Sequence, residues 1–186
     1  KFFFQKNIKL NDPNRDISIY TMAIEKNPRY VDAYAARARE KQKLNNYMGA
    51  ISDFSMALNI DPKAAIIYDQ RSMTYYRNNN FYQAMSDAET ALELQPNLAG
   101  LYFLKANIKI KQNEISGGCM DIEKAIYLLK NKKDYFTLIG VNPPILLSQY
   151  EKVKEAFADS YRACRNLNVP YEFERNIDNF IRESYA

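Results

Sequence analysis

The feature that most constrains the fold of this chain is an internal repeat of 34 residues. Pro28, Pro62 and Pro96 lie 34 residues apart, and each follows a polar residue. A fixed period of this length is typical of repeat proteins, in which small supersecondary units stack on their neighbours. The sequence therefore predicts three similar units, which cover residues 31–64, 65–98 and 99–132.

Small and apolar residues recur at the same positions of these three units. Counted from the first residue of each unit, the shared residues are Tyr34, Tyr68 and Tyr102 (position 4), Ala38, Ser72 and Ala106 (8), Tyr47, Phe81 and Ile115 (17), Ala50, Ala84 and Gly118 (20), Phe54, Ala88 and Ile122 (24), and Ala57, Ala91 and Ala125 (27). Within 31–44 the apolar residues follow a period of about 3.6 residues, which predicts a helix. Asn45-Asn46 and Asn78–Asn80 are expected to break the first helices, and a second helix begins near Tyr47.

This skeleton resembles the tetratricopeptide repeat (TPR), a family of helix–turn–helix units. The resemblance implies an all-α, right-handed superhelix, and it covers 31–132 as three full repeats. The small residues at positions 8 and 20 would let the paired helices approach closely. The chain departs from the family at position 8, where Ala or Ser replaces Gly. It departs again at position 11, where Lys41 and Lys109 replace the Tyr that only Tyr75 retains.

The two ends of the chain are expected to be atypical. Residues 1–30 read as a partial N-terminal repeat, whose first helix is cut short or reduced to Phe2–Leu10. Residues 133–186 read as a degenerate fourth repeat followed by capping helices, because stacked repeats leave a terminal face that a cap must cover. A distinct small helical domain is the alternative. The first residue is Lys1 rather than Met, so we expect a trimmed or processed chain, and the sequence does not indicate its compartment.

Composition argues against catalysis and against cofactors or metals. The chain has no His, which removes the commonest general base and metal ligand, and it contains no phosphate-binding or zinc-protease motif. We therefore expect a protein that is not an enzyme and that has no cofactor. No run of about 18 uncharged apolar residues suggests a membrane span. Cys119 and Cys164 belong to no C-x-x-C pair, and each fits an apolar helical position, so free thiols are favoured over a single bridge.

The resemblance also implies a binding surface, because the first helices of TPR arrays line the concave groove. The residues expected to contact a partner are Arg39, Lys43, Gln70, Met73, Tyr76, Arg77, Phe103, Leu104, Asn107 and Lys111. Lys43, Arg77 and Lys111 would form a basic ladder along one rim. The alternative for these cations is a favourable place near a helix C-terminus. For the apolar residues of the set, the alternative is packing against a neighbouring helix.

The function expected from this pattern is a non-catalytic protein–protein interaction module, a scaffold or adaptor. Its partner would be a protein or peptide, acidic with apolar anchors. Chaperone C-terminal tails are not expected, because the family's clamp positions hold Ala35, Arg39, Gln70, Gly100 and Leu104, of which only Gln70 is chemically close. Self-association into a homo-oligomer through terminal repeats is the alternative. Nucleic-acid binding is weaker still, because only Tyr76 with Arg77 pairs an aromatic with a cation.

Overall fold

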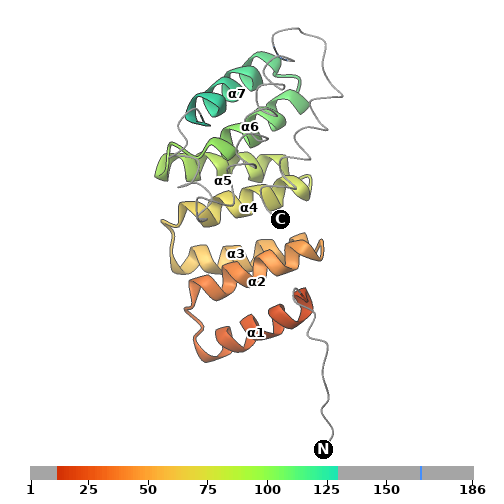
Figure 1. Ribbon diagram of the computed structural model, residues 1–186, viewed down its shortest axis with the longest axis vertical. Helices are drawn as coiled ribbons and strands as arrows, with labels where there is room; N and C mark the ends of the chain where they lie inside the picture. Colours follow the sequence, from red (N-terminus) through yellow and green to blue (C-terminus); the bar gives the residue numbers. More distant parts are fainter. Residues whose placement is uncertain (1–11, 130–163, 165–186) are drawn as a thin grey trace, which may run out of the picture. The chain divides into compact units, whose positions relative to one another are not determined.

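The computed structural model describes residues 12–129 and Cys164, and the described part is built from α-helices alone (Figure 1). These helices are α1 (Pro13–Lys26), α2 (Val31–Lys43), α3 (Tyr47–Ile60), α4 (Ala65–Arg77), α5 (Phe81–Leu94), α6 (Ala99–Lys111) and α7 (Ile115–Leu129). The helix bounds confirm the predicted first helix near 31–44 and the second helix that begins at Tyr47. The predicted Phe2–Leu10 helix lies outside the described residues, and so does the predicted cap over 133–186 apart from Cys164.

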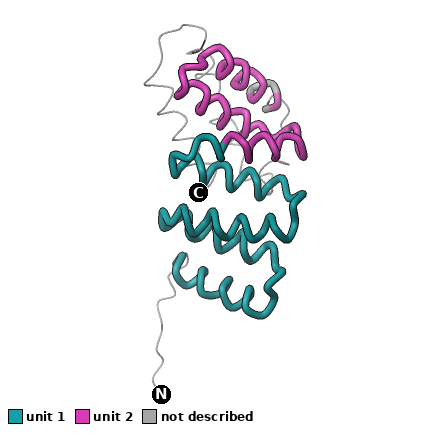
Figure 2. The backbone as a smooth tube through the Cα atoms, turned by 180° about the vertical axis from the view of Figure 1, so that it is seen from behind, with its two compact units in different colours: residues 1–84 teal, residues 85–186 magenta. Residues whose placement is uncertain are grey.

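The chain forms two compact units, Lys1–Ala84 and Met85–Ala186, and the boundary falls within α5 (Figure 2). In the first unit, α2 packs against α1 and α3, and α3 packs against α4. Its core contains Tyr34, Ala35, Ala38, Ala50, Phe54, Ala57, Leu58 and Ile67. In the second unit, α6 and α7 form the main helix pair.

Small residues allow the paired helices to approach closely, as the repeat pattern predicts. In the first unit, Ala38 of α2 and Ala50 of α3 have no exposed surface. In the second unit, a Cβ atom on Gly118 would lie 2.6 Å from Ile110 Cγ1 and 3.0 Å from the carbonyl oxygen of Ala106. Contacts this short leave no room for a side chain. Position 20 is therefore a contact point between α6 and α7.

The turn between the helices of each repeat contains an asparagine in the left-handed conformation. Asn45, Asn79 and Asn113 have φ values of 58°, 60° and 66°. In the first repeat the N–H of Asn46 then donates to the carbonyl of Lys41 at 2.9 Å. A left-handed residue followed by this backward hydrogen bond is a common way to end a helix. The sequence signals at Asn45 and Asn79 are confirmed, whereas Asn113 was not recognised as a turn residue.

Candidate partner-binding surface

The predicted cations of the first unit differ in their surroundings. Arg39 is exposed on α2, and Arg77 is partly buried at the end of α4. The Lys43 side chain is 48% exposed, and its Nζ lies 2.9 Å from Glu40 Oε1 one helical turn earlier. Arg39 and Lys43 therefore present positive charge to solvent on α2. Lys43 also lies in the last turn of α2, as the helix C-terminus alternative requires, and its role toward a partner stays a prediction.

The helices α2 and α4 are joined by a direct polar contact beside these cations. Gln42 Nε2 donates to Thr74 Oγ1 at 2.6 Å, and Thr74 Oγ1 donates to the carbonyl of Gln70 at 2.7 Å. Gln70 is partly exposed, and its Oε1 atom is buried without a hydrogen bond among the described residues. Ile66, one turn before Gln70, is 43% exposed. An exposed apolar side chain and an unused acceptor thus lie one turn apart on α4.

Several predicted contact residues are buried within their own units. In the first unit Met73 is 3% and Tyr76 is 9% exposed, and the Tyr76 ring lies 5.6 Å from that of Phe81. In the second unit Phe103, Leu104 and Asn107 are each at most 2% exposed. For the four apolar and aromatic residues this burial agrees with the packing alternative, and contact of all five residues with a partner stays a prediction. Lys111 at the end of α6 is exposed.

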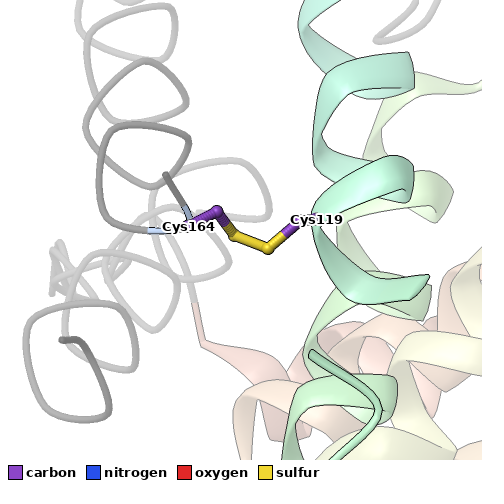
Figure 3. Close-up of a disulfide and its surroundings, with 2 residues drawn as sticks. All are labelled: Cys119 and Cys164. Atoms are coloured by element: carbon purple, nitrogen blue, oxygen red, sulfur yellow. A yellow bond between two sulfur atoms is a disulfide. The ribbon is translucent and has the colours of Figure 1, made fainter. Parts of the chain in front are cut away.

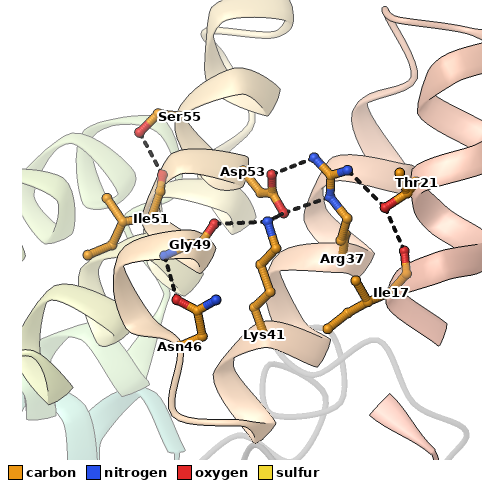
Figure 4. Close-up of polar contacts among 9 residues, drawn as sticks. All are labelled: Ile17, Thr21, Arg37, Lys41, Asn46, Gly49, Ile51, Asp53 and Ser55. Atoms are coloured by element: carbon orange, nitrogen blue, oxygen red, sulfur yellow. Dashed lines mark hydrogen bonds and ion pairs between the residues drawn. The ribbon is translucent and has the colours of Figure 1, made fainter. Parts of the chain in front are cut away.

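A buried ion network in the first unit was not predicted from the sequence. Asp53 of α3 has a side chain that is 4% exposed, and it accepts from both Arg37 and Lys41 of α2, each at 2.7 Å. Arg37 also donates to Thr21 of α1 at 3.1 Å (Figure 4). The hydrogen bond with Asp53 raises the pKa of the Arg37 guanidinium, so its charged form is favoured. The network joins α1, α2 and α3 through two cations and one carboxylate.

Comparisons with solved structures identify the fold. The first TPR of Spaghetti (RPAP3), bound to the HSP90 peptide SRMEEVD, is 19% identical with a TM-score of 0.52, and the match covers 58% of this chain and 86% of that chain. The MamA protein is 14% identical with a TM-score of 0.62, over 82% of this chain and 81% of that chain. The Sgt2 TPR domain from Aspergillus fumigatus is 18% identical with a TM-score of 0.54, over 76% and 85%. The chain has the TPR fold. No protein-family model and no curated protein sequence matches it.

The TPR register shows that the polar contacts recur with the repeat. At position 7, Arg37 contacts Thr21, Arg71 Nη1 donates to Ser55 Oγ at 2.9 Å, and Lys105 Nζ lies 3.6 Å from Glu89 Oε1. The three partners are also 34 residues apart. In each case the first helix of a full repeat contacts the helix that precedes it in the chain. The 34-residue recurrence of these pairs was the sequence signal that could have revealed them.

The same register explains the departure from the TPR pattern at position 11. Lys41 Nζ lies 2.7 Å from Asp53, and Lys109 Nζ lies 2.7 Å from Asp121 Oδ2. In both repeats the lysine is on the first helix and the aspartate is on the second helix. A lysine–aspartate pair therefore holds the TPR hairpin together where a tyrosine is usual in the family.

The two cysteines correct an expectation from the sequence. Free thiols were favoured, but Cys119 of α7 forms a disulfide with Cys164, with 5.8 Å between their Cα atoms (Figure 3). The sequence could not show this bond because the partners are 45 residues apart and follow no spacing motif. Within the described residues, no group of three or more acidic, His or Cys side chains could hold a metal ion. No helix described there is long and apolar enough to cross a membrane.

Proposed function

We propose that this TPR chain is a non-catalytic protein-interaction module that binds an acidic peptide segment of a partner on α2 and α4. Support for the general function comes from the fold, because a TPR structure similar to this chain is bound to a peptide. Fold likeness alone is an analogy, so the specific proposal depends on the side chains of this chain.

The observation that carries the proposal is the combination of exposed groups on two joined helices. Arg39 and Lys43 expose positive charge on α2, and Ile66 is an exposed apolar residue on α4. The Gln42–Thr74 hydrogen bond joins α2 and α4 next to Lys43 in the sequence. Carboxylates of a partner would be steered by the cations, and an apolar side chain on Ile66 would supply contact area.

The partner we propose differs from the HSP90 peptide of the Spaghetti structure. Recognition of such a tail requires cations that clamp its terminal carboxylates. At the matching positions this chain has Ala35, which is 6% exposed, and Leu104, which is 1% exposed. Gly100 occupies another of these positions and has no side chain. We therefore expect acidic side chains within a segment to be recognised, rather than a free C-terminus.

The experiment selects ligands for the full chain from a displayed library of peptides and then measures their affinity for matched variants. The double reversal Arg39→Glu with Lys43→Glu should weaken binding about tenfold or more and flatten its salt dependence, because the steering charges are reversed. The control is Arg29→Glu with Lys63→Glu, the same charge change at two exposed turn residues. Affinity within about twofold of wild type is expected for that control.

A second variant separates the apolar contribution from the charges. Ile66→Ser should weaken the selected peptide several-fold while its salt dependence stays that of wild type, because no charge is changed. If the Arg39→Glu, Lys43→Glu double variant and the Ile66→Ser variant both bind the peptide as tightly as wild type, binding on α2 and α4 is refuted. Selection of peptides without acidic residues would refute the proposed acidic partner. Selection of peptides that match segments of this chain would favour self-association instead.

A further inference from the structure

The disulfide lies on a face of α7 whose counterpart in the first repeat contacts the next repeat. Cys119 occupies position 21 of its repeat, and the same position of the first repeat holds Ile51 of α3, which is 8% exposed. Ser55, one turn after Ile51, accepts a hydrogen bond from Arg71 of α4. The face of α3 that carries Ile51 and Ser55 therefore packs against the first helix of the following repeat. The equivalent face of α7 carries Cys119.

We propose that the Cys119–Cys164 bond is a redox-controlled lock that pins Cys164 to this face of α7. Cys164 is helical, and its Cα lies 5.8 Å from that of Cys119. Cys164 is thus held against the side of α7 that corresponds, in the repeat register, to the side of α3 that contacts α4. Stacked repeats bury this face against the next element of the chain, and the bond attaches Cys164 there.

The lock forms by thiol–disulfide exchange with a disulfide of a thiol oxidoreductase or with oxidised glutathione. The thiolate of one cysteine attacks that disulfide, forms a mixed disulfide and releases one thiol of the oxidant. The second thiolate then attacks the mixed disulfide, closes the Cys119–Cys164 bond and releases the second thiol. The protein loses two electrons and two protons, and these reduce the disulfide of the oxidant to two thiols. Such exchange favours the closed bond in an oxidising compartment and the open dithiol in a reducing one.

The disulfide should stabilise the folded protein, and the size of the effect depends on the number of residues in the loop that it closes. The two cysteines are 45 residues apart, so the bond removes many conformations from the unfolded chain. Opening the bond is expected to lower the melting temperature and to release the face of α7 around Cys119. The ion network around Asp53 belongs to the other unit and contains no cysteine, so it provides an internal reference.

The test uses the full chain equilibrated with oxidised glutathione and then with an excess of dithiol reductant. Peptide mass mapping without reduction should recover a cross-linked pair that contains Cys119 and Cys164. Reduction should lower the melting temperature by about 5–15 °C and raise amide exchange in α7, with both changes reversed on reoxidation. The double variant Cys119→Ser with Cys164→Ser should match the reduced protein and should not respond to reductant.

Two results would overturn the proposal. One is full alkylation of both thiols after oxidation, which would show that the bond does not form. The other is a cross-linked protein whose melting temperature and amide exchange in α7 are the same before and after reduction. That result would show that the bond forms but does not stabilise α7. If the double variant fails to fold, the reduced wild type still supplies the comparison.

Discussion

At the scale of single residues, three asparagines determine where each hairpin turns. Asn45, Asn79 and Asn113 all have positive φ, a conformation that costs most residues about 1–2 kcal/mol because Cβ approaches a carbonyl oxygen. Asparagine tolerates it better than other residues with a side chain, and glycine tolerates it best. These side chains therefore matter less for their contacts than for the backbone that they permit.

The matched variants Asn79→Gly and Asn79→Val test this explanation. The glycine variant should keep the stability of wild type or exceed it slightly. The valine variant should lose about 1–2 kcal/mol, because a β-branched residue is strained at a φ of 60°. Thermal or urea unfolding of the two proteins measures the difference. A valine variant as stable as the glycine variant would show that the turn relaxes to another conformation.

These asparagines also show how far a turn can be recognised from sequence. Asn45-Asn46 and Asn78–Asn80 were recognised because several short polar residues stand together, whereas Asn113 stands between Gln112 and Glu114. What the turn requires is one residue that tolerates the left-handed region, with no need for a polar run. The 34-residue spacing of the three asparagines was therefore the better signal.

At the scale of helices, the contact between α6 and α7 depends on the absence of a side chain at Gly118. We expect Gly118→Ala to cost about 1–3 kcal/mol, because its Cβ would lie 2.6 Å from Ile110 and 3.0 Å from a backbone oxygen. Gly100→Ala is the control, since a Cβ there would meet nothing within 4 Å. That variant should be neutral or slightly stabilising because alanine favours a helix. Chemical unfolding measures both, and equal stability of the two variants would contradict the close approach.

The helices and their close contacts could be predicted from the sequence. Which apolar side chains are buried, and which polar side chains pair, could not. Small residues at fixed positions specify where backbones meet, because only those residue types fit. An apolar periodicity does not distinguish a side chain that packs inside the protein, such as Phe103, from one that is exposed and available to a partner. The pairing of Asp53 with Arg37 and Lys41 depends on side-chain reach between helices, which the sequence of either helix alone does not contain.

At the scale of the whole molecule, the described parts of the two compact units share a lysine–aspartate pair but differ in one further interaction each. In the first, one buried carboxylate holds two cations and thereby links three helices. In the second, a covalent bond attaches Cys164 to α7. Repeat arrays are stabilised by contacts between neighbours, so a local change in one tie should not spread far along the chain. The two ties should therefore be separable by experiment.

Hydrogen exchange measured along the whole chain tests this separation. Asp53→Asn leaves the charges of Arg37 and Lys41 without their buried counter-ion, which should cost about 3 kcal/mol and raise amide exchange in α2 and α3. Exchange in α7 should stay that of wild type. Reduction of the disulfide should raise amide exchange in α7 and leave exchange in α2 and α3 at the wild-type level. Glu25→Gln, at an exposed residue of α1, should change neither region. A uniform rise along the chain after either change would mean that the array unfolds as one cooperative block.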